Sequence, residues 1–262
     1  MRVGAFITLA VLFLIGTLCA AAAVEASQIT YGLPTGSTDA AGDPLAITAT
    51  FATTAGQLTI TVRNELGDAL HGFQTSSNQA LSDIFFTLSN FQSTGTLSSS
   101  LSTGIERVIT SSNGSFTDPN GAIQVPTGWA LHTGVSGGYL LCVLCTGTAH
   151  HTIIGGPGPV DLFHYSNADS TLTDPANSPY LTGTVTFIIT GIPNFNSSVF
   201  VDGVTFSFGT TEGQSLAGTC EGLEGVSCLP GRRVPEPSTL LLLGAGLVGL
   251  AGLGLRTRRP TK

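Results

Sequence analysis

The sequence has few basic residues, and most of them lie near its ends. Its 262 residues include 9 Lys and Arg against 16 Asp and Glu, which gives a formal net charge of −7. Between Ser27 and Gly231 only Arg63 and Arg107 are basic, and they face 14 carboxylates, so this stretch carries 2 − 14 = −12. A surface this acidic repels phosphate backbones, which excludes nucleic acid as a partner.

Residues that favour helices are also scarce in this stretch, which is rich in Thr, Ser, Gly, Val, Ile and Phe instead. Leu45–Phe51 and Leu58–Val62 alternate apolar residues with Thr, the period of a half-buried strand. Further strands are predicted at residues 83–88, 106–110, 128–132, 139–143, 162–165, 183–189, 198–201 and 204–208. The predicted fold class is therefore all-β, a single β-sandwich for which a jelly roll is one open topology.

Turns and core residues follow from the same pattern. The segment 52–57 is expected to close a hairpin, and Asp202-Gly203 between two apolar runs is typical of a two-residue hairpin turn. The aromatic residues expected in the core are Phe51, Phe85, Trp129, Phe187 and Phe206.

Residues 1–26 have the organisation of a secretory signal peptide. Arg2 precedes an apolar run over residues 3–18, and small residues follow at 20–23. We expect signal peptidase to cleave after Ala26, with Ala23 as the alternative. Leu18 before Cys19 argues against a lipoprotein, which needs a small residue there.

The C-terminus has three parts in a fixed order. Pro235-Glu236-Pro237 precedes sixteen apolar residues, 240–255, and a basic cluster follows, made of Arg256, Arg258, Arg259 and Lys262. A helix of that length measures roughly 24 Å, which is short for a hydrocarbon layer of about 30 Å and fits a transient anchor. The basic cluster is expected to stay in the cytoplasm and leave the acidic part outside.

This order closely resembles the PEP-CTERM sorting signal of Gram-negative bacteria, over Val234 to Lys262. The resemblance implies that an exosortase-type membrane protease recognises Val234, Pro235, Glu236 and Pro237 in a precursor anchored in the inner membrane. It also implies a cell-surface or extracellular destination and an association with exopolysaccharide. Residues 78–87 and 204–213 are similar to stretches of a PEP-CTERM subgroup whose exported domain has no assigned activity.

The sequence therefore predicts three segments. Residues 1–26 form the signal peptide, residues 27–231 form the β-sandwich passenger domain, and residues 232–262 form the sorting signal with a transmembrane helix at 239–255. The predicted sandwich is thus flanked by a signal helix at the N-terminal end and by the sorting helix at the C-terminal end.

Four cysteines remain once the signal peptide is removed. They are Cys142, Cys145, Cys220 and Cys228, and an even number in an exported chain predicts disulfides. Three connectivities are possible, of which the simplest pairs Cys142 with Cys145 and Cys220 with Cys228. A thioredoxin-like role would need a helix starting at the first cysteine, where the pattern predicts a strand instead.

Zinc is the next alternative for this cysteine pair. Cys142, Cys145, His150 and His151 are suitable ligand types, but adjacent histidines on an extended chain point to opposite sides. We expect no metal site here and no cofactor.

An enzyme is the alternative function. Gly134–Gly138 matches G-x-S-x-G around Ser136, for which His150, His151 or His164 could act as base, but a strand is predicted to follow instead of a helix. Paired carboxylates among the loop acids Asp161, Asp169, Asp174 and Asp202 could indicate a glycosidase or a calcium site. The interpretation favoured by the sequence is a non-enzymatic surface or matrix protein, structural, adhesive or polysaccharide-associated, with a secreted polymer hydrolase as the alternative. A Ser136–His contact or two facing carboxylates in one cleft would favour the enzyme.

Overall fold

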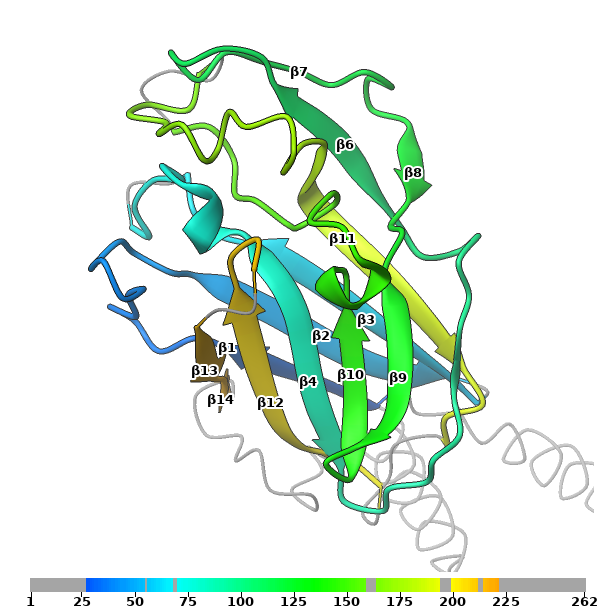
Figure 1. Ribbon diagram of the computed structural model, residues 1–262. Coiled ribbons are helices and arrows are strands. Elements are labelled where there is room, and N and C mark those ends of the chain that lie inside the picture. Colours follow the sequence, from blue (N-terminus) through cyan, green and yellow to red (C-terminus); the bar gives the residue numbers. More distant parts are fainter. Residues whose placement is uncertain are drawn as a thin grey trace, which may run out of the picture. The chain divides into compact units, whose positions relative to one another are not determined.

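Figure 1 shows the computed structural model of the chain. It describes residues 27–54, 56–67, 70–158, 164–193, 199–211 and 214–221. These residues belong to one compact unit, Met1–Gly222, while the second unit, Leu223–Lys262, lies outside the described residues. The predicted signal helix and sorting helix lie outside them as well. Within the described part, no helix is long and apolar enough to cross a membrane.

The described chain forms two antiparallel sheets packed face to face, which confirms the predicted β-sandwich (Figure 1). The larger, nine-stranded sheet has the order β14-β1-β2-β3-β11-β6-β7, with β5 and β8 added beside β11 and β6. Its strands are β14 (Thr219–Cys220), β1 (Ser27–Gly32), β2 (Ile47–Thr54), β3 (Gln57–Asn64), β11 (Tyr180–Thr190), β6 (Thr103–Ile109), β7 (Phe116–Thr117), β5 (Thr96–Leu97) and β8 (Gln124–Pro126).

The five-stranded sheet lies in front of it in Figure 1, in the order β13-β12-β4-β10-β9. Its strands are β13 (Ser215–Ala217), β12 (Val201–Phe208), β4 (Leu81–Leu88), β10 (Gly138–Cys142) and β9 (Ala130–Val135). Two short 3₁₀ helices, η1 (Ser77–Gln79) and η2 (Leu144–Thr146), complete the described elements.

The alternating sequence pattern explains the sandwich. In β2 and β3 every second side chain is buried and the residues between them face outward, so each strand offers one apolar face to the opposite sheet. The two strands pair from Ile47↔Asn64 to Thr54↔Gln57, as the predicted hairpin requires.

The core lies between the two sheets. Phe51, Phe86, Phe187 and Phe206 are fully buried there, and Phe86 stacks on Tyr139 with ring centroids 5.0 Å apart. Each buried phenylalanine contributes roughly 1.5–3 kcal/mol relative to an exposed one. Trp129 packs against Phe187 at one edge.

Two sequence predictions fail in detail. Phe85 is only half-buried, because the alternation of β4 turns Phe86 inward instead. Asp202-Gly203 is not a hairpin turn: β12 continues through it, and the pairing with β4 shifts register between Val201 and Gly203. The Asp-Gly pair therefore marks a bulge, which glycine also favours.

The predicted strands at 162–165 and 198–201 are also wrong where the structure describes them. His164 forms an isolated β-bridge with Ser115 and is not part of a strand. Residues 199 and 200 are a bend and a coil before β12 begins at Val201. The sequence pattern also missed β1 and the short strands β5, β7, β8, β13 and β14.

A second, smaller core supports the edge of the larger sheet. Tyr165, Leu172 and Tyr180 are fully buried there beside Ile109, and Phe116 packs against them. This cluster is built largely from the long connection between η2 and β11, so it fixes that loop against β6.

Candidate functional site

A cleft of about 460 Å³ opens beside the end of β3 and the start of β11. It brings together Arg63 and Arg107, the two basic residues of the acidic stretch from Ser27 to Gly231. Its lining residues are Arg63, Asn64, Glu65, Leu66, Gly67, Ile105, Arg107, Asp118, Gly121, Ala122, Gly156, Pro157, Thr182 and Gly183.

An irregularity in β11 shapes this cleft. Thr182 pairs with Ile105 of β6. The next pair is Thr186 with Thr103, so four steps along β11 oppose two steps along β6. Gly183, inside this bulge, has a φ of 70°, a conformation that glycine adopts without strain. Bulges bend strands and are common beside functional sites, which fits the position of this cleft.

A buried polar network fixes the cleft wall. The Asn64 side-chain amide donates to the carbonyl oxygens of Gln79 (3.1 Å) and Ile153 (3.2 Å). Its own oxygen accepts the Leu66 N–H at 3.1 Å. The Gln79 amide in turn donates to Pro44 O at 2.8 Å. The chain after β3 is thereby tied to three other segments, and the groups that line the cleft are held in place.

Arg63 forms the exposed side of the cleft. Its side chain is 62% exposed, and its Nε lies 3.0 Å from Glu65 Oε2. Thr48 donates its hydroxyl to the other carboxylate oxygen of Glu65, at 2.8 Å. Glu65 is therefore positioned by two partners, while much of the Arg63 guanidinium stays accessible to a ligand.

Arg107 forms the buried side, and its side chain is only 11% exposed. Its guanidinium donates two bonds of 2.7 Å to the two carboxylate oxygens of Asp118 and one of 3.1 Å to the Tyr165 hydroxyl. It also lies 3.8 Å from the centre of the Phe116 ring. Burial lowers the pKa of Arg107, but the hydrogen bond to Asp118 and the interactions with Tyr165 outweigh it, so that pKa is raised overall.

The cleft thus presents two arginine–carboxylate pairs whose charges balance. Guanidinium groups only donate hydrogen bonds, and carboxylates only accept them. A ligand that binds to an arginine and to its carboxylate partner must therefore offer both hydrogen-bond acceptors and hydrogen-bond donors. Hydroxyl groups have this property. Ile105 and Pro157 in the lining add apolar contact area beside these polar groups.

This cleft was not predicted from the sequence. The sequence does show that Arg63 and Arg107 are the two basic residues of the acidic stretch from Ser27 to Gly231. It does not show that they lie close together, because their proximity depends on the pairing of β3, β11 and β6.

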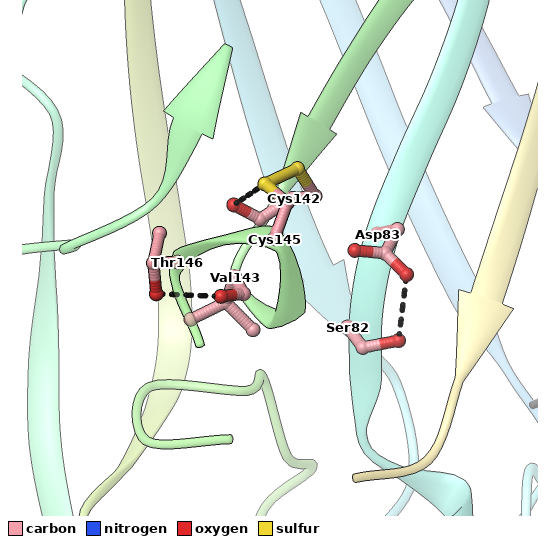
Figure 2. Close-up of a disulfide and its surroundings, with 6 residues drawn as sticks. All are labelled: Ser82, Asp83, Cys142, Val143, Cys145 and Thr146. Carbon is pink, nitrogen blue, oxygen red and sulfur yellow. Dashed lines mark hydrogen bonds between the residues drawn. A yellow bond between two sulfur atoms is a disulfide. The ribbon is translucent and has the colours of Figure 1, made fainter. Parts of the chain in front are cut away.

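The cysteines give a second cluster, at the end of β10 (Figure 2). Cys142 and Cys145 form a disulfide with Cα atoms 5.7 Å apart, as predicted. His132 of β9 lies beside them, and the ligand atoms of these three residues lie within 4.8 Å of one another. Cys220 is also disulfide-bonded, and its predicted partner Cys228 lies outside the described residues.

The two histidines considered for zinc are placed elsewhere. His151 Nδ1 lies 3.0 Å from Thr127 O and its Nε2 lies 3.2 Å from Glu106 Oε1. Its carbonyl oxygen accepts the Trp129 indole N–H at 2.8 Å. His151 therefore joins β6 to the segment before β9, while His150 is exposed and does not belong to the cysteine cluster.

Ser136 does not lie on a nucleophile elbow. Ser136 and Gly137 have φ angles of 46° and 77° and connect β9 directly to β10, the conformation of a type I′ hairpin turn. The elbow requires a strand followed by a helix, so the G-x-S-x-G match is explained by hairpin geometry.

Of the loop acids, Asp169, Asp174 and Asp202 do not line the cleft. Asp169 accepts the N–H groups of Thr171 and Leu172, and Asp174 accepts that of Ala176, which are turn-stabilising bonds. Asp202 lies exposed in β12, and Asp161 lies outside the described residues. The carboxylates that do share a cleft are Glu65 and Asp118.

The predicted sorting residues lie outside the described part of the chain, from Val234 to Pro237 and from Arg256 to Lys262. Their assignment comes from comparison with known families, where the PEP-CTERM protein-sorting motif matches residues 233–259. The chain therefore carries a PEP-CTERM sorting motif in its C-terminal segment. The PEP-CTERM motif implies a membrane-anchored, exported precursor that an exosortase, a membrane protein, processes. No curated protein and no solved structure matches the chain.

Proposed function

We propose that this PEP-CTERM protein acts outside the cell as a non-enzymatic component of the surface or matrix that binds polysaccharide through the Arg63–Arg107 cleft. The observation that carries the proposal is the pairing of both arginines of the passenger domain with carboxylates in one cleft. Signal peptidase removes residues 1–26, and the sorting signal then delivers the sandwich to the exterior.

The chemistry of the cleft suits a sugar chain. Each sugar hydroxyl both donates and accepts a hydrogen bond, so it can bridge a guanidinium and its carboxylate partner. Arg63 and Glu65 offer such a pair at the exposed side, and Asp118 is held by Arg107 at the buried side. None of the described residues that line the cleft is aromatic, so the proposed recognition rests on polar contacts, and a weak affinity per site is expected.

A secreted hydrolase is the second candidate, because Glu65 and Asp118 share the cleft. Glycosidases use two carboxyl groups across the scissile bond, one of which must donate a proton. Here each carboxylate is held by an arginine in an ion pair, so neither is placed as a free proton donor. The binding function therefore fits the cleft better.

The two functions are separated by one set of measurements on the full chain in detergent. Binding to a glycan array and release of reducing ends from the bound polymers are measured for the wild type, Glu65→Gln and Asp202→Asn. Each variant loses one carboxylate, but Asp202 lies exposed on β12, away from the cleft lining. We expect Glu65→Gln to weaken glycan binding by about tenfold, equivalent to about 1.4 kcal/mol, and Asp202→Asn to bind as the wild type does.

Two results would count against the binding function. Absence of binding to every glycan on the array contradicts it outright. Reducing ends that are released by the wild type and lost in Glu65→Gln would establish the hydrolase instead.

A further inference from the structure

A CxxC pair and a histidine from a neighbouring strand meet on the outer face of the five-stranded sheet. β9 and β10 pair with His132 opposite Leu140, two residues before Cys142. Side chains two residues apart on a strand share a face, so His132 and Cys142 project to the same side. The opposite face of β10 holds Tyr139 and Leu141, which are buried in the core.

The turn that follows β10 brings in the second cysteine. In η2 the Thr146 N–H donates to Val143 O at 3.0 Å, and Gly147 ends the turn in the left-handed conformation. The chain thereby folds back over the end of the strand. Figure 2 shows the bond that joins Cys145 of this turn to Cys142 at the end of β10. Cys145 is exposed, whereas Cys142 is buried.

The three side chains lie close enough together to bind one metal ion after the disulfide is reduced. A tetrahedral zinc ion has bonds of about 2.0–2.3 Å, which place its ligand atoms about 3.5–3.8 Å apart. The imidazole nitrogen and the two sulfur atoms lie within 4.8 Å of one another, so small side-chain rotations suffice once the sulfurs separate. Cys145 and His132 are exposed, so solvent can reach these ligands and supply a fourth one such as water.

The electrostatic surroundings favour a cation. Asp83 of β4 is the direct cross-strand neighbour of Cys142, and its carboxylate accepts the Ser82 hydroxyl at 3.2 Å (Figure 2). The acidic character of the whole domain adds to this local charge.

We propose that Cys142, Cys145 and His132 form a binding site for a thiophilic divalent cation such as Zn²⁺ when the cysteines are reduced, and that the disulfide closes this site. A dithiol reductant supplies two electrons and two protons, which convert the Cys142–Cys145 disulfide into two thiols. The dithiol itself is oxidised to a disulfide. Binding of the cation then releases the two thiol protons, because thiolates are the ligands. The site is independent of the Arg63–Arg107 cleft and of sorting.

Cobalt is the probe for this site, because Co²⁺ bound by thiolates shows a charge-transfer absorption in the near ultraviolet. The untagged full chain in detergent is titrated with Co²⁺ after reduction by a phosphine and, in parallel, without reduction. We expect one ion per reduced chain and no charge-transfer band for the oxidised chain. Added Zn²⁺ should displace the cobalt and abolish the band.

Four variants locate the ligands. Cys145→Ser should abolish the band, and His132→Ala should weaken cobalt binding by about tenfold or more. The matched controls are Cys220→Ser, which removes a cysteine of the other disulfide, and His150→Ala, which removes an exposed histidine outside the cluster. Both controls should bind cobalt as the wild type does.

Three results would overturn the proposal. The first is a reduced chain without a charge-transfer band. The second is a band that survives in Cys145→Ser, which would place the site at other cysteines. The third is equal affinity of His132→Ala and the wild type, since His132 is exposed and its replacement leaves the sheet intact.

Discussion

At the scale of single residues, the tyrosines show how the fold handles polar groups in its core. The chain has four tyrosines, Tyr31, Tyr139, Tyr165 and Tyr180, and all four are buried. Each hydroxyl donates to a backbone carbonyl, for example Tyr165 to Gly155 O at 2.8 Å and Tyr31 to Val201 O at 3.0 Å. These bonds satisfy the hydroxyl groups only in the neutral form.

Burial raises the pKa of all four tyrosines above the usual value of 10.0. The unfolded chain therefore loses tyrosine protons at lower pH than the folded chain does, and the free energy of unfolding must fall as pH rises above about 10. Between pH 7 and 9 we expect these tyrosines to leave the free energy of unfolding unchanged. At higher pH the protein should unfold, and tyrosinate absorbance should appear together with the loss of β-sheet circular dichroism. Tyrosinate absorbance that rises near pH 10 while the circular dichroism is retained would contradict this burial.

At the scale of structural elements, two loops pack closely enough to exclude a side chain. The segment after β3 lies against residues 155 and 156, and Gly156 N donates to Leu66 O at 2.8 Å. A Cβ on Gly155 would meet the Leu66 carbonyl oxygen far inside van der Waals contact. A Cβ on Gly156 would meet nothing within 4 Å, and neither glycine has a positive φ.

These neighbours form a matched pair of substitutions. Gly155→Ala should lower the free energy of unfolding by about 2 kcal/mol, because the two backbone segments must move apart. Gly156→Ala should change stability by less than about 1 kcal/mol, with stabilisation as the expected direction because alanine restricts the unfolded chain. Urea denaturation of both variants measures the difference, and equal midpoints would show that the two loops are not packed as described.

Much of the element pattern could be predicted, because the longer strands alternate cleanly. Leu45–Phe51 and Leu58–Val62 were recognised for this reason, and they correspond to β2 and β3 in the structure. The Asp202-Gly203 pair was misjudged because bulges and tight turns favour the same residues. Strands of two or three residues, such as β5 and β14, are too short to show an alternation of apolar and polar residues, so they cannot be recognised from the sequence.

The candidate site could not be predicted for a different reason. Arg63 and Arg107 are 44 positions apart and meet only because β11 pairs with both of their strands. His132 and the cysteines depend likewise on the register of β9 against β10. The Cys142–Cys145 disulfide was predictable, because a pair three residues apart depends on local geometry alone.

At the scale of the whole molecule, the three predicted segments differ in charge. The stretch from Ser27 to Gly231 carries −12, and its two arginines both line the cleft. Seven of the nine basic residues lie in the predicted signal and sorting segments, where they suit membrane orientation. The acidic sandwich is thereby suited to a solvated exterior, and the PEP-CTERM motif at residues 233–259 gives the route to it.

The C-terminal mass of the mature protein tests this account most directly. It is measured by mass spectrometry on the cell-surface and extracellular fractions, for the wild type and for a variant with alanine at Pro235, Glu236 and Pro237. We expect the wild-type chain to end at or near residues 235–237, and the variant to keep its basic tail to Lys262 and stay with the membrane. Identical processing of the two chains, or a wild-type protein that retains Lys262 at its destination, would contradict it.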